Sequence, residues 1–478
     1  MQVIDKKVRN NVIYSALYQV LTVVTPLITT PYISRVLTAE GVGEYSYRLS
    51  IASYFTLFVG LGFSLYGVVK VAQIRDDKKL LSKLFWEIML AKVVLLLGAL
   101  AAYYTIFLSQ RKDLLLHIIM SFGIISTALD VTWLLNGLEE FKITLVRSTV
   151  VRIVNLLAIF FLVKKSSDLW LYALITQGSD LVSQFALYPA IRKHIQFTPI
   201  APRNVIKHLK ASLVYFIPSI VHTVFTSTDK TMLCYMCNIA EVGYYEQANK
   251  LCNLCMSTIC SASTVLLPRI TYMHQKGDTD VSEFIGRLVD ILLFFSIPVM
   301  LGLAAASNNF VPIFFGEGYE KTAMLMKILC LNVLIMVLCN FCGQQCLIAK
   351  GKQRQYNIAV VLGAIFNVIF NAVFISLFAS AGAAFASVIS GIINLGAIFF
   401  FAKKEVNLKN HKKNILQYTL AGIVMLACVL LTGHYIIGIV GLIFEVVVGV
   451  VVYFAMLIFL HNELVITVIQ TIKAKKSR

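Results

Sequence analysis

A few basic side chains lie inside or at the edges of long apolar segments, and they are the residues of this sequence best suited to chemistry. Arg48, Lys230 and Lys250 are the three of greatest interest, because polar side chains surround each of them. A base in an apolar environment is costly unless it meets an anion or lines a water-filled cavity. Arginine and lysine are natural partners of phosphate. The pattern predicts a polar chamber that binds an anionic guest, not a site that breaks bonds.

Nearby acids offer these bases an alternative. Glu44 lies four residues before Arg48, and Glu246 lies four residues before Lys250, so each pair could neutralise itself on one helix face. Asp229 adjoins the lysine that follows it, but adjacent helical residues point about 100° apart and pair poorly. Even with these pairings, the segments keep an excess of bases.

Polar side chains also recur at helical spacing. Thr25 belongs to such a stripe in the first apolar segment, His222 and Asp229 to one in the seventh, and Asn253 to one in the eighth. Residues three or four apart share a helix face, and such a face either bonds a neighbouring helix or lines a cavity. We expect the cavity, with these four side chains beside the bases. His222 could relay protons, or it could stay neutral with one hydrogen bond.

Two prolines interrupt the same segments. Pro26 lies in the first and Pro218 in the seventh. Proline removes a backbone hydrogen bond and bends a helix. Each proline therefore predicts either a hinge or a static kink.

The composition is that of a membrane protein. The chain has 478 residues, of which 58% are hydrophobic and 14% charged, whereas a soluble domain carries roughly 25% charged residues. Apolar runs of about 20 residues, long enough to span a bilayer as helix, recur along the whole chain. We predict an all-α, polytopic transmembrane helix bundle with 12–14 spans. The predicted spans are 11–34, 44–69, 84–108, 114–137, 143–163, 168–190, 211–236, 244–270, 288–306, 322–348, 356–379, 382–402, 415–433 and 436–460.

The formal net charge of +18 gathers in alternate loops. Lysine and arginine collect in the cytoplasmic loops of membrane proteins, so this pattern is an orientation signal and places both termini in the cytoplasm. We expect no nucleic-acid partner. The basic loops include Lys70–Lys83, Arg192–Lys210, Lys403–Lys413 and the tail Lys473–Arg478.

The cysteines predict neither a metal site nor a redox site. Cys234 and Cys237, like Cys252 and Cys255, have C-x-x-C spacing, but they lie in apolar helical runs where cysteine packs as a small hydrophobe. No G-x-x-x-x-G-K-[ST] motif occurs, and no polar segment is long enough to form a soluble core. We therefore expect no metal and no cofactor.

A short internal repeat divides the chain. Val42-Gly43 and Tyr45 match Val242-Gly243 and Tyr245 at a shift of 200 residues, and each copy follows the first long helix of its half. Both copies leave that helix on the same side, which indicates parallel, pseudo-symmetric halves, a recurring transporter design. We predict an N-terminal six-helix bundle in 1–210, a C-terminal six-helix bundle in 211–402, and two additional helices with a basic tail in 403–478.

Several motifs, in order, resemble those of bacterial polysaccharide biosynthesis proteins, the Wzx-type flippases of lipid-linked repeat units. Each piece is short, but together the pieces cover most of residues 1–360. They are Pro31–Leu37 with Gly41–Tyr45, Asp130–Phe141, Thr228–Met232 with Val242–Tyr245, Leu267–Ile270, Phe315–Tyr319 and Ala349–Lys352.

The resemblance implies the multidrug/oligosaccharidyl-lipid/polysaccharide exporter superfamily, with a MATE-like fold and a central cavity. It further implies a bacterial inner-membrane flippase that moves an undecaprenyl-pyrophosphate-linked oligosaccharide to the outer leaflet by alternating access. H+ or Na+ are the candidate coupling ions, and a polysaccharide polymerase is a candidate partner. The expected protein is not an enzyme.

Other functions remain open at this point. A multidrug exporter of the same fold would need acids facing the cavity, and segment 11–34 contains no Asp or Glu. A polysaccharide polymerase or membrane glycosyltransferase would need a substantial aqueous loop, which the sequence lacks. A lipid scramblase without sugar specificity is a third possibility that the sequence leaves open.

Overall fold

The computed structural model describes residues 6–107, 114–200, 202–264, 273, 281–403, 411–467 and 470. Within these residues the chain is helical and contains no strand, so the all-α prediction is confirmed. By length and composition, ten helical stretches of this part can cross a membrane, and the protein is a multi-pass membrane protein. The Leu267–Ile270 motif and the tail from Lys473 lie outside the described residues.

The chain divides into two compact units, Met1–Thr231 and Met232–Arg478. Residues 211–231 therefore group with the first unit, and residues 403–478 group with the second. The longest membrane-crossing stretches, Val20–Ile74 and Gln353–Ala402, contain more than one predicted span each, because their helices follow one another with almost no linker.

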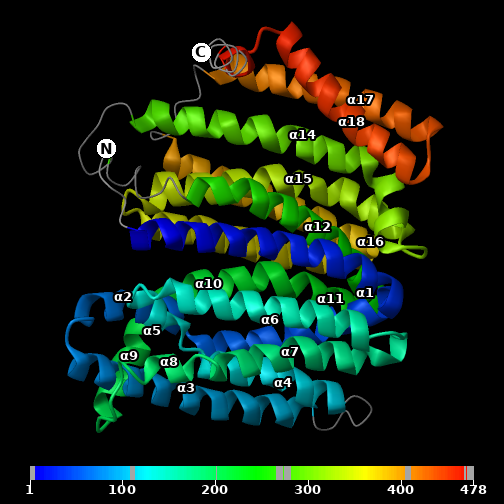
Figure 1. The fold of residues 1–478 in the computed structure, drawn as a ribbon. Helices are drawn as coiled ribbons and strands as arrows, with labels where there is room; N and C mark the ends of the chain where they lie inside the picture. Colours follow the sequence, from blue (N-terminus) through cyan, green and yellow to red (C-terminus); the bar gives the residue numbers. More distant parts are fainter. Residues whose placement is uncertain are drawn as a thin grey trace. The chain divides into compact units, whose positions relative to one another are not determined.

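The first unit begins with α1 (Lys6–Gly60), which bends at Thr38. Thr38 has φ 61° and ψ 177°, outside the helical region, and this break separates the first two predicted spans. The helix continues through Pro26 and Pro31 without another such break. Figure 1 shows the helices that follow, which are α2 (Phe63–Ile74), α3 (Lys78–Phe107), α4 (Leu114–Leu129), α5 (Thr132–Gly137), α6 (Phe141–Leu162), α7 (Leu169–Phe185) and α8 (Tyr188–Ile191).

The last part of the first unit is irregular. The helix α9 (Pro202–Ser212) leads into the 3₁₀ turn η3 (Leu213–Tyr215), then α10 (Phe216–Thr223). A π-helical segment, η4 (Val224–Thr228), connects α10 to α11 (Asp229–Met236). Such π-turns insert one extra residue into a helix and occur often at functional sites.

Basic loops of the first unit meet at one of its ends, where the α2–α3 turn lies near α8 and α9 (Figure 1). Arg75 pairs with Glu139 at 3.0 Å, and His194 contacts Glu140 at 3.1 Å. The opposite end carries the α6–α7 turn, where the Asp168 carboxylate accepts the backbone N–H groups of Lys164 and Lys165. These bonds hold the pKa of Asp168 below its usual range.

The second unit packs its helices around one large apolar core. Its helices are α12 (Ile239–Thr264), α14 (Val281–Phe315), α15 (Glu320–Cys342), the π-helical η5 (Gly343–Ile348), α16 (Gln353–Ala402), α17 (Lys412–Tyr435) and α18 (Gly438–Phe459). The helices α17 and α18 pack on α14, where the Tyr453 hydroxyl donates to the Phe294 carbonyl at 2.9 Å. The two additional predicted helices are thus part of this core.

A sharp turn divides α16 at Ala379, which has φ 51°. Three residues later Gly382 approaches the Phe374 carbonyl so closely that an added Cβ would lie 1.9 Å from its oxygen. Only glycine fits at position 382. This close approach of the two helices accounts for a glycine in the short break between the two predicted spans.

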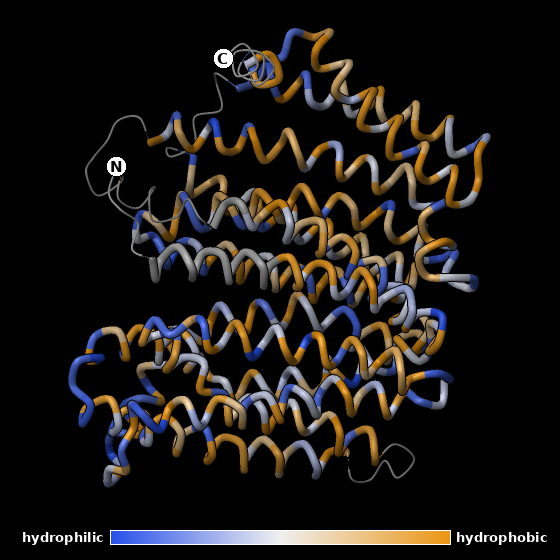
Figure 2. The backbone as a smooth tube through the Cα atoms, viewed as in Figure 1, coloured by the Kyte–Doolittle hydropathy of each residue, from blue (hydrophilic) through white to orange (hydrophobic). Residues whose placement is uncertain are grey.

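Apolar residues run along the helices, and hydrophilic residues gather at the connecting turns (Figure 2). Large apolar side chains remain uncovered, such as Phe161 on α6 at 74% exposure and Val214 at 70%. Exposed apolar side chains are stable next to lipid tails. The helices also pair their own backbone N–H and C=O groups, as lipid requires.

Candidate binding site

Arg48 lies in α1, three turns after the Thr38 bend, and is 4% exposed. Its guanidinium forms an ion pair with Glu44, and Nε donates to Glu44 Oε1 at 2.5 Å. The predicted i,i+4 pair therefore exists. Nη1 also contacts His117 Nε2 on α4 at 2.6 Å. The other ring nitrogen, His117 Nδ1, lies 2.9 Å from the Tyr103 hydroxyl on α3. We call Glu44, Arg48, His117 and Tyr103 the arginine cluster.

Sequence reasoning missed His117 and Tyr103. A signal for this contact was present, because the two residues lie at similar distances from the short connection between α3 and α4. Residues equally far from a helix hairpin turn reach the same depth on neighbouring helices. His117 lies in an otherwise apolar segment and has 2% exposure, so its partners must come from other helices.

A row of hydroxyl groups joins the second half of α1 to η4 and α11. Ser53 Oγ lies 2.8 Å from Ser227 Oγ, and the Tyr54 hydroxyl lies 3.4 Å from Thr228 Oγ1 and 3.3 Å from Thr231 Oγ1. We call these five residues the hydroxyl seam. All of them belong to the first unit. Each hydroxyl group of the seam can both donate and accept a hydrogen bond.

Asp229 and Lys230 lie within the seam's sequence, between Thr228 and Thr231. Asp229 is 2% exposed and Lys230 is 9% exposed. The structure thus places the helix that carries Arg48 beside the segment that carries these two predicted site residues. The polar stripes instead predict a common cavity for the segments 11–34 and 211–236, and that cavity stays a prediction.

His222 and Pro218 lie on α10, on the other side of the π-turn. His222 is exposed, and its carbonyl accepts the Thr226 hydroxyl at 2.9 Å. The predicted stripe joined His222 to Asp229 at regular helical spacing, but the extra residue of η4 rotates the helix by about 100° between them. As a result, His222 is exposed while Asp229 is buried. Pro218 lies between the 3₁₀ turn and the π-turn, in the most irregular stretch of the unit.

Thr25 and Pro26 lie in the first half of α1. The Thr25 carbonyl accepts the Thr29 hydroxyl at 3.0 Å. This bond is local to the helix, and both Thr25 and Pro26 are half-buried.

Lys250 and Asn253 belong to the second unit, on α12. Asn253 is exposed and donates to Asn249 Oδ1 at 3.2 Å, while Lys250 is half-buried. At the start of the same helix, Glu241 accepts Lys321 Nζ at 2.5 Å and the Ser380 hydroxyl. This carboxylate ties α12 to α15 and to the turn within α16.

Other charged residues of the membrane segments pair within their own unit. Lys92 Nζ donates to the Asp130 carbonyl at 2.8 Å. Glu87 accepts Asn204 Nδ2 at 2.9 Å and lies 3.0 Å from His208 Nε2. Hydrogen bonds within the first unit thus satisfy these two buried charged groups.

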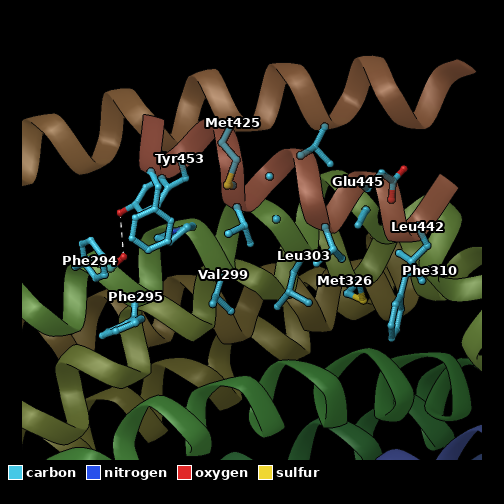
Figure 3. Close-up of a pocket in the computed structure, with 18 residues that line it drawn as sticks. Phe294, Phe295, Val299, Leu303, Phe310, Met326, Met425, Leu442, Glu445 and Tyr453 are labelled. Atoms are coloured by element: carbon cyan, nitrogen blue, oxygen red, sulfur yellow. Dashed lines mark hydrogen bonds between the residues drawn. The ribbon is translucent and has the colours of Figure 1, made fainter. Parts of the chain in front are cut away.

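An apolar cavity of about 430 Å³ lies in the second unit, among α14, α15, α17 and α18. Figure 3 shows Glu445 at one end of it, and Phe294 and Tyr453 at the other. Glu445 accepts Asn309 Nδ2 at 2.6 Å through Oε1, and Oε2 has no hydrogen-bond partner among the described residues. The remaining lining side chains are apolar, so the cavity suits hydrocarbon.

The described residues contain no group of three or more His, Cys, Asp or Glu side chains placed to hold a metal ion. The ten cysteines are free thiols. Burial raises the pKa of Cys237, which lies in the turn between α11 and α12.

Comparison with known proteins supports a transporter architecture. The family model described as "Polysaccharide biosynthesis protein" matches residues 8–274. The "Putative O-antigen transporter" of Escherichia coli (strain K12) is 24% identical over 374 residues, which cover 75% of this chain and 88% of that protein. The protein of the same description from Shigella dysenteriae is 22% identical over 345 residues, or 71% of this chain and 86% of the relative.

Two solved structures share the fold. The lipid II flippase MurJ, in an inward closed conformation, superposes with a TM-score of 0.77 at 18% sequence identity, covering 95% of this chain and all of that one. An inward-facing MATE family multidrug resistance transporter superposes with a TM-score of 0.57 at 11% identity, covering 80% of this chain and 97% of that one. The expected MATE-like fold is confirmed.

Proposed function

The chain belongs to the family of polysaccharide biosynthesis proteins, and from that premise we propose that it flips a lipid-linked oligosaccharide across the bacterial inner membrane. The cargo is an undecaprenyl-pyrophosphate-linked repeat unit of a cell-surface polysaccharide, moved from the inner to the outer leaflet. The relatives are named as transporters, which supports transport and not enzymatic chemistry.

Buried bases beside hydroxyl groups are the observation that carries this proposal. Arg48 and Lys230 are 4% and 9% exposed, and the hydroxyl seam joins the helices that carry them. Moving a pyrophosphate out of water costs several kcal/mol per charge unless bases and hydrogen-bond donors replace the water. Arg48 and Lys230 supply the positive charge, and the seam supplies donors for phosphate and sugar oxygens.

Glu44 competes with the guest for Arg48. A pyrophosphate carries more negative charge than one carboxylate, so it can displace part of the contact between Glu44 and the guanidinium when it binds. Lys250 and Asn253 remain proposed contacts of the cargo, as do Asp229, His222 and Thr25.

The conformational change uses the irregular segment that contains Pro218. The 3₁₀ turn, the proline and the π-turn lie within residues 213–228, so this stretch departs from regular α-helical hydrogen bonding at three places. Pro26 is the corresponding hinge in α1. Rocking at these positions alternates access to the two leaflets.

The membrane potential favours the proposed direction. A potential that is negative inside drives an anion outward with about 2.3 kcal/mol per charge per 100 mV. With both termini cytoplasmic, the basic loops face the leaflet that supplies the cargo. A flipping rate in vesicles that does not depend on the sign of an imposed potential would contradict this part of the proposal.

Deletion of the gene, followed by analysis of lipid-linked intermediates, tests the function. We expect a lipid-linked repeat unit to accumulate on the inner leaflet, and a plasmid copy to restore export. Unchanged intermediates, combined with greater sensitivity to organic cations, would instead establish a multidrug exporter.

A further inference from the structure

The apolar cavity of the second unit, about 430 Å³ in volume, lies between two long helix faces. Its lining residues on α18 recur every three or four positions from Leu442 to Phe454, and those on α14 do so from Phe294 to Phe310. Residues at this spacing form one face of a helix, and the face on α18 is about 18 Å long at 1.5 Å per residue. The two faces, shown in Figure 3, shape the cavity for one extended hydrocarbon chain.

One end of the cavity has its polar groups satisfied within the protein. Pro298 has no backbone N–H, so the Phe294 carbonyl, four residues earlier in α14, lacks its helical donor. The Tyr453 hydroxyl donates to this carbonyl at 2.9 Å and replaces the missing bond. This end therefore needs no polar group from a ligand.

The other end holds a carboxylate with an unmet need. Glu445 is 2% exposed, and its Oε2 has neither a hydrogen-bond donor nor a basic partner among the described residues. Its Oε1 accepts Asn309 Nδ2, and α17 makes room for it with Gly433, where an added Cβ would lie 2.2 Å from Oε1. A buried carboxylate without a base is costly. This end thus lacks one donor and one positive charge.

We propose that the cavity binds a membrane-soluble primary amine with a single hydrocarbon chain. The ammonium group lies on Glu445 Oε2, and the chain follows the apolar faces of α14 and α18. An ammonium supplies both the missing donor and the missing charge. If the carboxyl group is protonated before binding, a neutral amine takes its proton, and the same ion pair forms. An alcohol supplies a donor without charge, and a quaternary ammonium supplies charge without an N–H donor.

The position of Glu445 along α18 suits an amphiphile that enters from the bilayer. Glu445 lies seven residues after Gly438, where α18 begins, so it is about 10 Å from the α17–α18 turn. The head of the ligand then points toward this turn and the chain toward the middle of the helix, as in a lipid of the adjacent leaflet. Val446 and Val450 line the cavity and are exposed, which leaves its side open to a hydrocarbon chain. This binding does not depend on the proposed flipping.

Photolabelling of the full-length protein in nanodiscs tests the proposal. The probe is dodecylamine with a diazirine at the end of its chain, and mass spectrometry identifies the labelled peptides. We expect saturable labelling of α14 or α18 near Phe294 and Tyr453, blocked by excess dodecylamine. Dodecanol should block it only at about tenfold higher concentration or more, since a charge-assisted hydrogen bond is the stronger one.

Two competitors decide against the proposal if they act as well as the amine. Equal blocking by dodecanol would show that the cavity recognises hydrocarbon without regard to charge. Equal blocking by a polyprenyl phosphate would assign the cavity to the tail of an isoprenoid lipid. Either result would overturn the amine site.

Two variants locate the site. Glu445→Gln keeps the shape of the side chain without its charge, so the half-saturating amine concentration should rise about tenfold or more; Glu463→Gln, at an exposed position of the same unit, should have no effect. Gly302→Leu fills the cavity from α14, where an added Cβ meets only Met425 Cε at 4.0 Å, and should abolish the labelling. Gly396→Leu, where an added Cβ meets nothing within 4 Å, is its control. Unchanged labelling in Glu445→Gln or in Gly302→Leu would refute the proposal.

Discussion

The Tyr45 hydroxyl donates a hydrogen bond to Thr176 Oγ1 at 3.0 Å, joining the second half of α1 to α7. The repeat partner of this tyrosine, Tyr245, makes the matching bond in the second unit, where its hydroxyl lies 2.9 Å from Ser387 Oγ and joins α12 to α16. The two tyrosines are 200 residues apart. The sequence repeat thus corresponds to a repeated tertiary contact inside each unit.

Removing either hydroxyl should weaken its own unit. Tyr45→Phe and Tyr245→Phe should each lower the free energy of unfolding by about 0.5–1.5 kcal/mol, since each leaves a hydroxyl partner without its bond. Thermal unfolding of the purified protein measures this change. Tyr435→Phe is the control, because Tyr435 is 80% exposed. Equal effects in all three variants would show that the two bonds do not stabilise the fold.

The turn within α16 should tolerate only glycine at position 382. A Cβ there would lie 1.9 Å from the Phe374 carbonyl oxygen, so Gly382→Ala must move the backbone and should cost more than about 4 kcal/mol. Gly396→Ala, on the same helix, meets nothing within 4 Å and should be neutral or stabilising. Yield of folded protein after detergent extraction distinguishes them. A well-folded Gly382→Ala protein would disprove the close approach.

The planar shape of the Arg48 guanidinium should matter for flipping, in addition to its positive charge. Arg48→Lys keeps one positive charge but loses the planar guanidinium that can bind two phosphate oxygens at once, so flipping should fall by about 10- to 100-fold. Arg35→Lys, at an exposed position of the same helix, should leave flipping unchanged. The measurement is export of the lipid-linked repeat unit in a deletion strain. Full activity of Arg48→Lys would mean that charge alone is sufficient.

The polar pair at the end of the apolar cavity should behave as a unit. Asn309→Leu leaves both Glu445 oxygens without a side-chain donor and should destabilise the protein by about 1–3 kcal/mol. The double variant Asn309→Leu with Glu445→Leu removes both partners and should recover most of that loss. Unfolding in a mild denaturant compares the two. If the double variant is less stable than Asn309→Leu, the two side chains are not coupled.

Most of the fold was predictable from apolar run lengths, because lipid forces the backbone into helices wherever about 20 apolar residues follow one another. The ion pair between Glu44 and Arg48 was predictable too, since it is local. The π-turn at 224–228 was not, because one extra residue in a helix leaves no clear pattern in composition. His222 attracted interest through a stripe that this turn breaks, whereas the bond of Arg48 to His117 spans 69 residues and depends on how α1 packs on α4.

Several acids at the basic end of the first unit already have partners. Glu139 is paired with Arg75, Glu140 with His194, and Glu87 with Asn204 and His208. Lysines and arginines outnumber the acids of that end, so its net charge toward the headgroups is positive. Anionic lipids should accumulate around this rim by electrostatic attraction, so a scarce, highly charged lipid would be locally enriched at the protein before it enters any binding site.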